Sequence, residues 1–237
     1  MNRTKCEDIS KKITESDAHM DCACSLLRMG KLKDAESEYK EAIKKDSENA
    51  FAHKALGNLY YRETRLDESI TEIKKAIKIN PKYADAHYEL GISLYRRGKL
   101  DEAIESFKEA IEINPNFHVA RYWLGLSYYY MGRIPEAIEF FNQVLEREPN
   151  VAIAHYHLGI AYAREGKNNE AVEQFEEFLK KCPGSAAAYY HLGNAYYSKG
   201  DLEHSINNFK KAVEIDPSDK RSKKNLDTLE ELRSKFF

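Results

Sequence analysis

The stretch RGKLDEAIESFKEAI, residues 97–111, has a close counterpart in MGKLKDAESEYKEAI, residues 29–43. Both stretches have a glycine as their second residue and continue into a run of small, apolar and charged residues that is typical of an amphipathic helix. Two such similar stretches in one chain indicate an internal repeat. The period of that repeat has to be established before any other structure is assigned, because a repeat architecture determines the whole fold.

The period is set by glycines that follow a leucine and recur every 34 residues, and prolines keep the same step. An aromatic or aliphatic residue follows each of these glycines by sixteen positions, and a small residue usually follows it by twelve. The glycines are Gly57, Gly91, Gly125, Gly159 and Gly193, and the prolines are Pro81, Pro115, Pro149, Pro183 and Pro217. Agreement between four kinds of position indicates tandem units that bury their apolar faces on one another.

Each repeat is predicted to be a helix–turn–helix. A glycine inside a helix costs about 1 kcal/mol relative to alanine, so a recurring one needs a packing reason. We expect it to let the first helix press on the second, opposite the small residue twelve positions later. A second glycine, such as Gly98, ends the first helix, and acidic residues such as Asp101 and Glu102 open the next. Helices of about 12–14 residues are marginal alone, so stacking must stabilise them.

Numbering each repeat so that the recurring glycine is position 8 divides the chain. Six repeats are predicted, at 16–49, 50–83, 84–117, 118–151, 152–185 and 186–219. In the first of them Ala23 replaces the glycine and Ser47 the proline. Residues 220–237 carry Leu226, Leu229, Leu232 and Phe236 at helical spacing and are predicted to form a capping helix. Residues 1–15 are an N-terminal extension, either a short helix through Ile9 and Ile13 or a frayed tail.

This pattern resembles the tetratricopeptide repeat family over residues 16–219. The resemblance implies an all-α fold, a right-handed superhelical solenoid of tandem helix–turn–helix repeats with a C-terminal capping helix. One departure is position 4, where the family often has tryptophan. Here the position holds His19, His53, His87, Arg121, His155 and Tyr189.

The charge and composition exclude several classes of partner. The formal net charge is -2 and 32% of the residues are charged, which gives no basic face for nucleic acid or an anionic membrane. No run approaches the ~20 apolar residues of a membrane span, and the N-terminus lacks the apolar core of a secretory signal. We therefore expect a cytoplasmic protein without disulfides, and Cys6 to be a solvent-exposed thiol and not a lipid-attachment site.

No combination of residues predicts chemistry. The chain has no phosphate-binding glycine loop, zinc-protease motif, paired CxxC or nucleophile elbow. Cys22 and Cys24 point to different faces of one predicted helix, so a shared metal is not expected. His157 and His191 stand at position 6 of adjacent repeats and are expected to approach each other. We favour lining of a groove over metal binding or pH sensing for them. The sequence thus predicts no enzyme, no cofactor and no metal.

The resemblance implies a concave groove lined by the first helix of each repeat, at positions 2, 5, 6, 9, 12 and 13. Tyrosine dominates positions 5 and 12, which suits a binding surface but is also common in the family. The candidate partner-binding residues are Lys54, Asn58, Tyr61, Tyr88, Ile92, Tyr95, Tyr122, Trp123, Leu126, Tyr129, Tyr156, His157, Ile160, Tyr190, His191 and Asn194.

The middle of this predicted groove is apolar and its ends are polar. Position 9 is often asparagine in the family, and the middle repeats instead have Ile92, Leu126 and Ile160, with Val119 and Ile153 at position 2 beside them. These apolar residues either form a binding site around the tryptophan at position 6 or are core residues buried between repeats. We favour the binding site, because tryptophan is a frequent anchor of protein interfaces.

A subset of the family binds the C-terminal carboxylate of large chaperones through lysine, arginine and asparagine side chains. Lys54 and Asn58 match the first pair of that clamp, but Glu89, Val119 and Trp123 occupy its other positions. Chaperone-tail binding is therefore disfavoured.

The function predicted is a scaffold or adaptor that takes a peptide or helical segment of a partner protein in its groove. Self-assembly is one alternative, with the end of one molecule, for example Phe236–Phe237, entering the groove of another to form a homo-oligomer. A non-catalytic regulatory partner of an enzyme is a further alternative.

Overall fold

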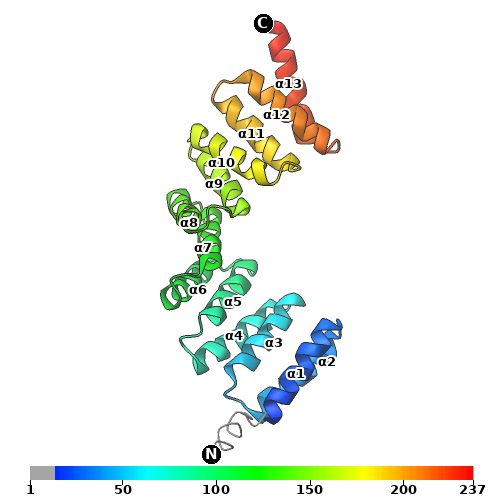
Figure 1. Cartoon of the computed structure of the whole chain (residues 1–237), viewed down its shortest axis with the longest axis vertical. Coiled ribbons are helices and arrows are strands. Elements are labelled where there is room, and N and C mark those ends of the chain that lie inside the picture. The colour runs from blue at the N-terminus through cyan, green and yellow to red at the C-terminus, as the bar shows by residue number, and fades with distance from the viewer. Residues whose placement is uncertain (1–13, 237) are drawn as a thin grey trace, which may run out of the picture. The chain divides into compact units, whose positions relative to one another are not determined.

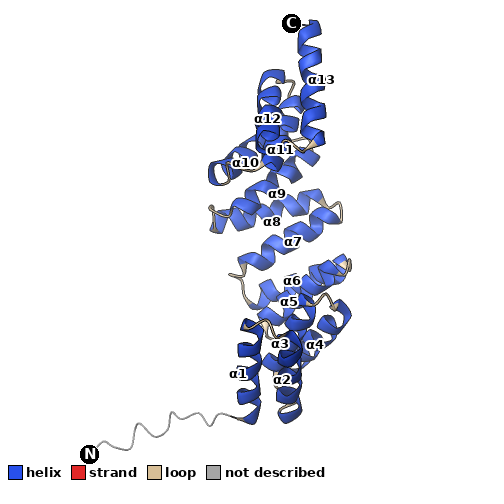
Figure 2. Cartoon of the chain, turned by 90° about the vertical axis from the view of Figure 1, so that its right-hand side faces the viewer, coloured by secondary structure: helices blue, strands red, loops and turns tan. Residues whose placement is uncertain are grey.

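The structure is a computed structural model that describes residues 14–236 as helices joined by short turns. No strand occurs in this part of the chain (Figure 2). The helices are α1 (Glu15–Arg28), α2 (Leu32–Lys45), α3 (Ala50–Arg62), α4 (Leu66–Ile79), α5 (Ala84–Arg96), α6 (Leu100–Ile113), α7 (His118–Tyr130), α8 (Ile134–Arg147), α9 (Ala152–Arg164), α10 (Asn168–Lys181), α11 (Ala186–Ser198), α12 (Leu202–Ile215) and α13 (Lys220–Phe236).

Two compact units divide the chain, unit 1 up to Phe117 and unit 2 from His118. In unit 1 the helices pack in consecutive pairs, α1 with α2, α3 with α4 and α5 with α6. In unit 2 α7 packs with α8, α9 with α10 and α11 with α12, and α13 packs on α12 (Figure 1). The all-α, helix–turn–helix fold class predicted from the sequence is confirmed, while the right-handed sense of the superhelix and the six repeat boundaries stay predictions.

The turns inside the pairs depend on a residue with positive φ. Gly98 has φ +82°, and the chain around it closes the end of α5 with a hydrogen bond from Lys99 N to Leu94 O of 2.9 Å. Glycine adopts this left-handed conformation without strain, as predicted for the second glycine of a repeat. Thr64 stands in the same turn between α3 and α4 with φ +62°. A β-branched residue is strained there.

The recurring glycine at position 8 leaves room for a large side chain of the second helix, because it has no Cβ atom. A Cβ atom added to Gly91 would lie 2.5 Å from a ring carbon of Phe107, which is fully buried. The side chain sixteen positions after the glycine therefore fills the space beside it. The sequence had suggested that the small residue twelve positions after the glycine faces it. The small residue contributes as well, since Ser205 Oγ donates to the carbonyl of Gly193 at 2.8 Å.

Position 4 shows why tryptophan is dispensable in this chain. The His53 Nδ1 atom lies 2.7 Å from a carboxylate oxygen of Glu72 on the second helix, and its Nε2 lies 3.3 Å from the Ser47 carbonyl. The imidazole thus links the two helices and the preceding turn. Arg121 has Phe140 in the corresponding place on α8, and its buried Nη1 atom has no hydrogen-bond partner among the described residues.

The two ends of the described chain are both helical. Thr14 caps α1 through a capping box with Asp17. Leu229 of α13 is buried with Ile206 and Phe209 of α12, so the predicted C-terminal helix covers the apolar side of the last pair. The predictions for Cys6, for a helix through residues 9–13, and for an inserting Phe237 lie outside the described residues.

None of the described helices has the length and apolar character needed to cross a membrane.

Candidate functional site

The candidate residues of unit 2 lie on three neighbouring helices, α7, α9 and α11, because α9 contacts both α7 and α11. We call their shared surface the α7–α9–α11 face. In the described part of unit 2, every exposed large hydrophobic side chain except Ile215 belongs to these helices: Val119, Tyr130, Ile153 and Tyr197. Val119 is 50% exposed and Ile153 is 44% exposed. Exposed apolar side chains gathered on one set of helices indicate an interaction surface.

Aromatic rings from successive repeats contact one another across this face. The Tyr122 ring meets the Trp123 ring edge-on at 5.9 Å and the His157 ring at 5.7 Å. The Tyr122 hydroxyl lies 3.0 Å from His157 Nδ1, which also lies 3.1 Å from the Ile153 carbonyl. Because that carbonyl can only accept, Nδ1 carries the proton and the tyrosine oxygen accepts from it as well. Trp123 is half-buried beside this contact.

The same arrangement recurs one repeat later. Tyr156 lies edge-on to both His157 and His191, with ring centroids 5.3 and 5.7 Å apart. The two histidines predicted to approach each other are thus connected through a tyrosine ring. His191 also stacks on Phe175 at 5.7 Å and lies edge-on to Tyr190.

Both histidines are held in the neutral form. Burial lowers the pKa of His157. Burial lowers the pKa of His191 to about 4, and the positive charge of Arg221 acts in the same direction, as protonation of His157 would. No group of three or more histidine, cysteine or acidic side chains in the described residues is arranged to hold a metal ion. The arrangement suits aromatic packing, with neutral imidazoles at neutral pH.

Arginines cover the tyrosines at the ends of the face. The guanidinium of Arg164 lies over the Tyr129 ring at 5.2 Å, and that of Arg221 lies over the Tyr190 ring at 4.9 Å. Such cation–π contacts fix a positive charge above an aromatic surface. These arginines were not among the residues predicted to bind a partner. The signal lay in the spacing, because Arg164 follows Tyr129 by one repeat and one residue.

The apolar residues at position 9 are less accessible than those at position 2. Leu126 is 6% exposed, and Ile160 is half-buried against the core formed by residues of α10 and α11. Their side chains mainly fill the space between helices and offer little area to a partner. The accessible apolar area comes from Val119 and Ile153 instead.

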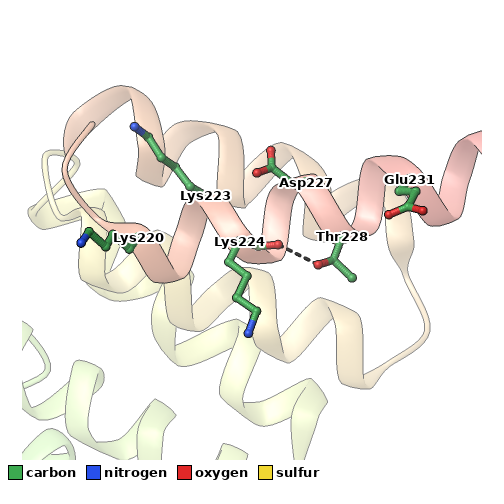
Figure 3. A pocket seen from close by; sticks show the side chains of 6 residues that line it. All are labelled: Lys220, Lys223, Lys224, Asp227, Thr228 and Glu231. Atoms are coloured by element: carbon green, nitrogen blue, oxygen red, sulfur yellow. Dashed lines mark hydrogen bonds between the residues drawn. The ribbon is translucent and has the colours of Figure 1, made fainter.

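An open pocket of about 330 Å³ lies where α11 meets α13. Its polar lining includes Asn194, Tyr197, Lys224 and Asn225, and the Asn225 carboxamide donates to Asn194 Oδ1 at 3.3 Å. Figure 3 shows Lys224 and Asp227 on α13, where both line a second open pocket together with Lys220 and Lys223. Of these residues, only Asn194 was predicted from the sequence to bind a partner. Asn225 stands 34 residues after His191, so extending the repeat into α13 identifies it.

In unit 1 the half-matched clamp is occupied by the chain's own carboxylate. Burial raises the pKa of Glu89, while the charge of Lys54 and a hydrogen bond from Asn58 lower it in part. The Lys54 ammonium also lies over the rings of Phe51 and Tyr83, at 5.4 and 5.2 Å. Glu89 therefore stands where the clamp would need an uncharged donor, and a ligand carboxylate would meet a like charge.

Of the other candidate residues in unit 1, some are buried in the core and others are half-buried. Ile92 is 6% exposed and belongs to the interior. Tyr88 is half-buried and packs against Phe117, with ring centroids 5.1 Å apart. Tyr61 is half-buried with the Arg96 guanidinium over its ring at 5.0 Å. Tyr95 is half-buried on the same helix as Ile92. Unit 1 thus repeats the tyrosine–arginine contact. Its position 2 holds Phe51, which is 52% exposed, in one repeat and Asp85 in the next.

Models of one protein family match most of the repeated region. Models described as Tetratricopeptide repeat match residues 84–117, 186–219 and 122–186, and a model described as TPR repeat matches residues 64–98. Comparison with curated protein sequences gave no match.

Several solved structures are similar to this chain. YrrB, described as a TPR protein with an unusual peptide-binding site, is 24% identical with a TM-score of 0.70, and the match covers 78% of this chain and 95% of YrrB. A MamA structure is 27% identical with a TM-score of 0.68, over 72% of this chain and 93% of MamA. PilF of Pseudomonas aeruginosa is 19% identical with a TM-score of 0.75, over 89% of this chain and 96% of PilF.

Proposed function

The chain belongs to the tetratricopeptide repeat family and has the fold of a protein-interaction scaffold, and we propose that it binds a peptide or helical segment of a partner protein on the α7–α9–α11 face. The observation that carries this proposal is the gathering of exposed apolar side chains on three neighbouring helices. A peptide that covers them removes apolar area from water, which supplies affinity.

Trp123 is the proposed anchor of the interaction. It is half-buried between the exposed Val119 on its own helix and the Tyr122–His157 contact, so a partner side chain that packs on the indole is surrounded by further apolar area. Leu126 and Ile160 support this surface from below because they are buried or half-buried. YrrB, which shares the fold, is itself described as having a peptide-binding site.

The test is affinity capture with the native chain and with two single variants. Trp123→Ala is expected to lower the affinity for captured partners by roughly thirtyfold, since an anchor residue contributes about 2 kcal/mol. Tyr196→Ala is the control. Tyr196 lies on α11, but its side chain is directed to the other helices, where it stacks on His204 of α12 and hydrogen-bonds to Glu176 of α10. Circular dichroism checks that both variants are folded.

Two results contradict the proposed site. The first is an unchanged set of partners, at unchanged affinity, with a folded Trp123→Ala variant. The second is an equal loss with Tyr196→Ala, which would place binding on the opposite helices of unit 2.

The proposal assigns the chain no catalytic role and a cytoplasmic location. Its sequence offers no catalytic motif, so an activity found in a complex would come from another subunit.

A further inference from the structure

Charges are sorted between the two helices of each pair in unit 2. The sequences of α7, α9 and α11 contain no aspartate or glutamate, whereas α8, α10 and α12 each contain at least two. Unit 1 lacks this separation, because α5 carries Asp85 and Glu89. The α7–α9–α11 face is therefore free of carboxylates on its own helices. About half of the carboxylates of unit 2 lie on the other helix of each pair, and the rest lie in the turns and on α13.

Cations border this face. Arg164 ends α9, and its contact with Tyr129 leaves it without a carboxylate partner among the described residues. The first turns of α13 add Lys220, Lys223 and Lys224, none of which forms an ion pair with a described residue, although Asp227 and Glu231 line the same open pocket (Figure 3). Arg221 is held over Tyr190 and pairs with Asp219 at 3.2 Å. Unpaired cations at the edge of a carboxylate-free surface create a local positive potential.

The polar groups near these cations can hold a carboxylate. In the pocket between α11 and α13, the Lys224 ammonium is accompanied by the carboxamides of Asn194 and Asn225 and by the Tyr197 side chain. The Asn194 Oδ1 atom accepts from Asn225, which leaves the Asn194 amide hydrogens directed to other acceptors. Ammonium, amide and phenol groups together form charge-assisted hydrogen bonds with a carboxylate, each shorter and stronger than a neutral one.

The same surface also needs apolar groups from its partner. Val119 and Ile153 are exposed beside Trp123, and Tyr130 and Tyr197 are exposed at the ends of α7 and α11. A purely charged ligand would leave these side chains in water, and a purely apolar one would leave the cations unmatched. Both kinds of group are required in one ligand.

We infer that the partner segment bound on the α7–α9–α11 face is acidic and carries interspersed aromatic or aliphatic side chains. Its apolar side chains pack on Trp123, Val119 and Ile153, and its carboxylates lie at Arg164 and in the pocket of Lys224. The net negative charge of α8 and of α10 repels the same segment, so charge also determines which side of unit 2 it approaches. This inference rests on the proposed function and adds the chemical class of the partner.

The probe is a fluorescein-labelled random copolymer of glutamate and tyrosine, measured by fluorescence anisotropy against the full chain. A copolymer of lysine and tyrosine is the matched probe of opposite charge. The Glu–Tyr copolymer is expected to bind and the Lys–Tyr copolymer to bind roughly tenfold more weakly or not at all, with affinity falling as salt rises.

Two double variants with the same change in net charge locate the binding. Arg164→Glu with Lys224→Glu reverses two cations of the proposed face, and is expected to weaken binding of the Glu–Tyr copolymer roughly tenfold or more. Lys181→Glu with Lys211→Glu reverses two cations of α10 and α12 and is expected to leave the affinity within about twofold. Circular dichroism and light scattering confirm that both variants are folded and have the same mass as the parent.

Several results would overturn the inference. Equal weakening in both double variants would mean that only the total charge matters. Equal binding of both copolymers, with Trp123→Ala still reducing it, would retain the proposed face and refute the acidic partner. Loss in neither Trp123→Ala nor the charge-reversed variants would refute the face as well. Tighter binding of a labelled oligothymidylate than of the Glu–Tyr copolymer, lost with Arg164→Glu and Lys224→Glu, would identify a nucleic acid as the ligand instead.

Discussion

Replacing Gly91 by alanine tests how closely the two helices of a repeat approach. The new Cβ would lie 2.5, 2.7 and 2.9 Å from three carbons of the Phe107 ring, below any normal contact distance. The ring is fully buried, so it cannot swing into solvent. At Gly125 the corresponding distances to the Phe141 ring are 3.1 Å, so a shift of a few tenths of an ångström is enough there.

The magnitude follows from two opposing terms. Alanine in a helix is favoured over glycine by about 1 kcal/mol, and this gain is the same at both positions. Overpacking a buried site costs about 1–3 kcal/mol. Gly91→Ala is therefore expected to destabilise the chain by up to about 2 kcal/mol, and Gly125→Ala to change its stability by less than about 1 kcal/mol. The difference between the variants isolates the cost of the contact with the ring.

Urea unfolding followed by far-ultraviolet circular dichroism measures both free energies. Amide hydrogen exchange in α5 and α6 shows whether the loss is local, as expected for repeats that contact only their neighbours. Adding Phe107→Leu to Gly91→Ala should cost less than Phe107→Leu alone, because the smaller side chain relieves the overlap. A Gly91→Ala chain that is more stable than the parent, or no coupling in the double variant, would refute the close approach.

Two further perturbations test the turn and the buried histidine. Thr64→Gly should raise the free energy of unfolding by about 0.5–1 kcal/mol, because glycine adopts the positive φ without strain. Gly132→Thr, in an equivalent turn, should lower it by about 1–2 kcal/mol. Urea unfolding measures both changes, and changes of the opposite sign would refute the strain. His191 titrates near 4 in the folded chain and near 6.5 when unfolded, so the unfolded state binds more protons in between and stability should rise with pH over that window. Unfolding midpoints at several pH values should show a flatter profile for His191→Phe, and an unchanged slope would contradict the lowered pKa.

The repeat pattern predicted most of the secondary structure because helix ends depend on local features. Glycines such as Gly98 end first helices through a left-handed turn that few other residues adopt without strain. The turn between α3 and α4 keeps the positive φ although it has no glycine, because Thr64 adopts this conformation there. Helix–turn–helix pairs and an all-α fold were therefore readable from the printed residues.

The solvent exposure of the candidate side chains could not be predicted from the repeat pattern. Val119 and Leu126 lie on one helix and are both apolar, but the first is 50% exposed and the second 6%. The roles of Arg164 and Lys224 depend on their neighbours in space. Arg164 lies over Tyr129 of the preceding repeat, and Lys224 lines a pocket with Asn194 of another helix. Likewise, Glu89 could be recognised as an acid from the sequence, but its burial beside Lys54 and Asn58 required the packed helices.

The sequence by itself thus determined the helices, their pairing and the tyrosine-rich character of the first helices, because these depend on residues within one repeat. The tertiary structure alone decided which apolar side chains face water, which cations lack a partner and which histidines are neutral. Those properties depend on side chains from neighbouring repeats, whose contacts exclude water from some positions and leave others open.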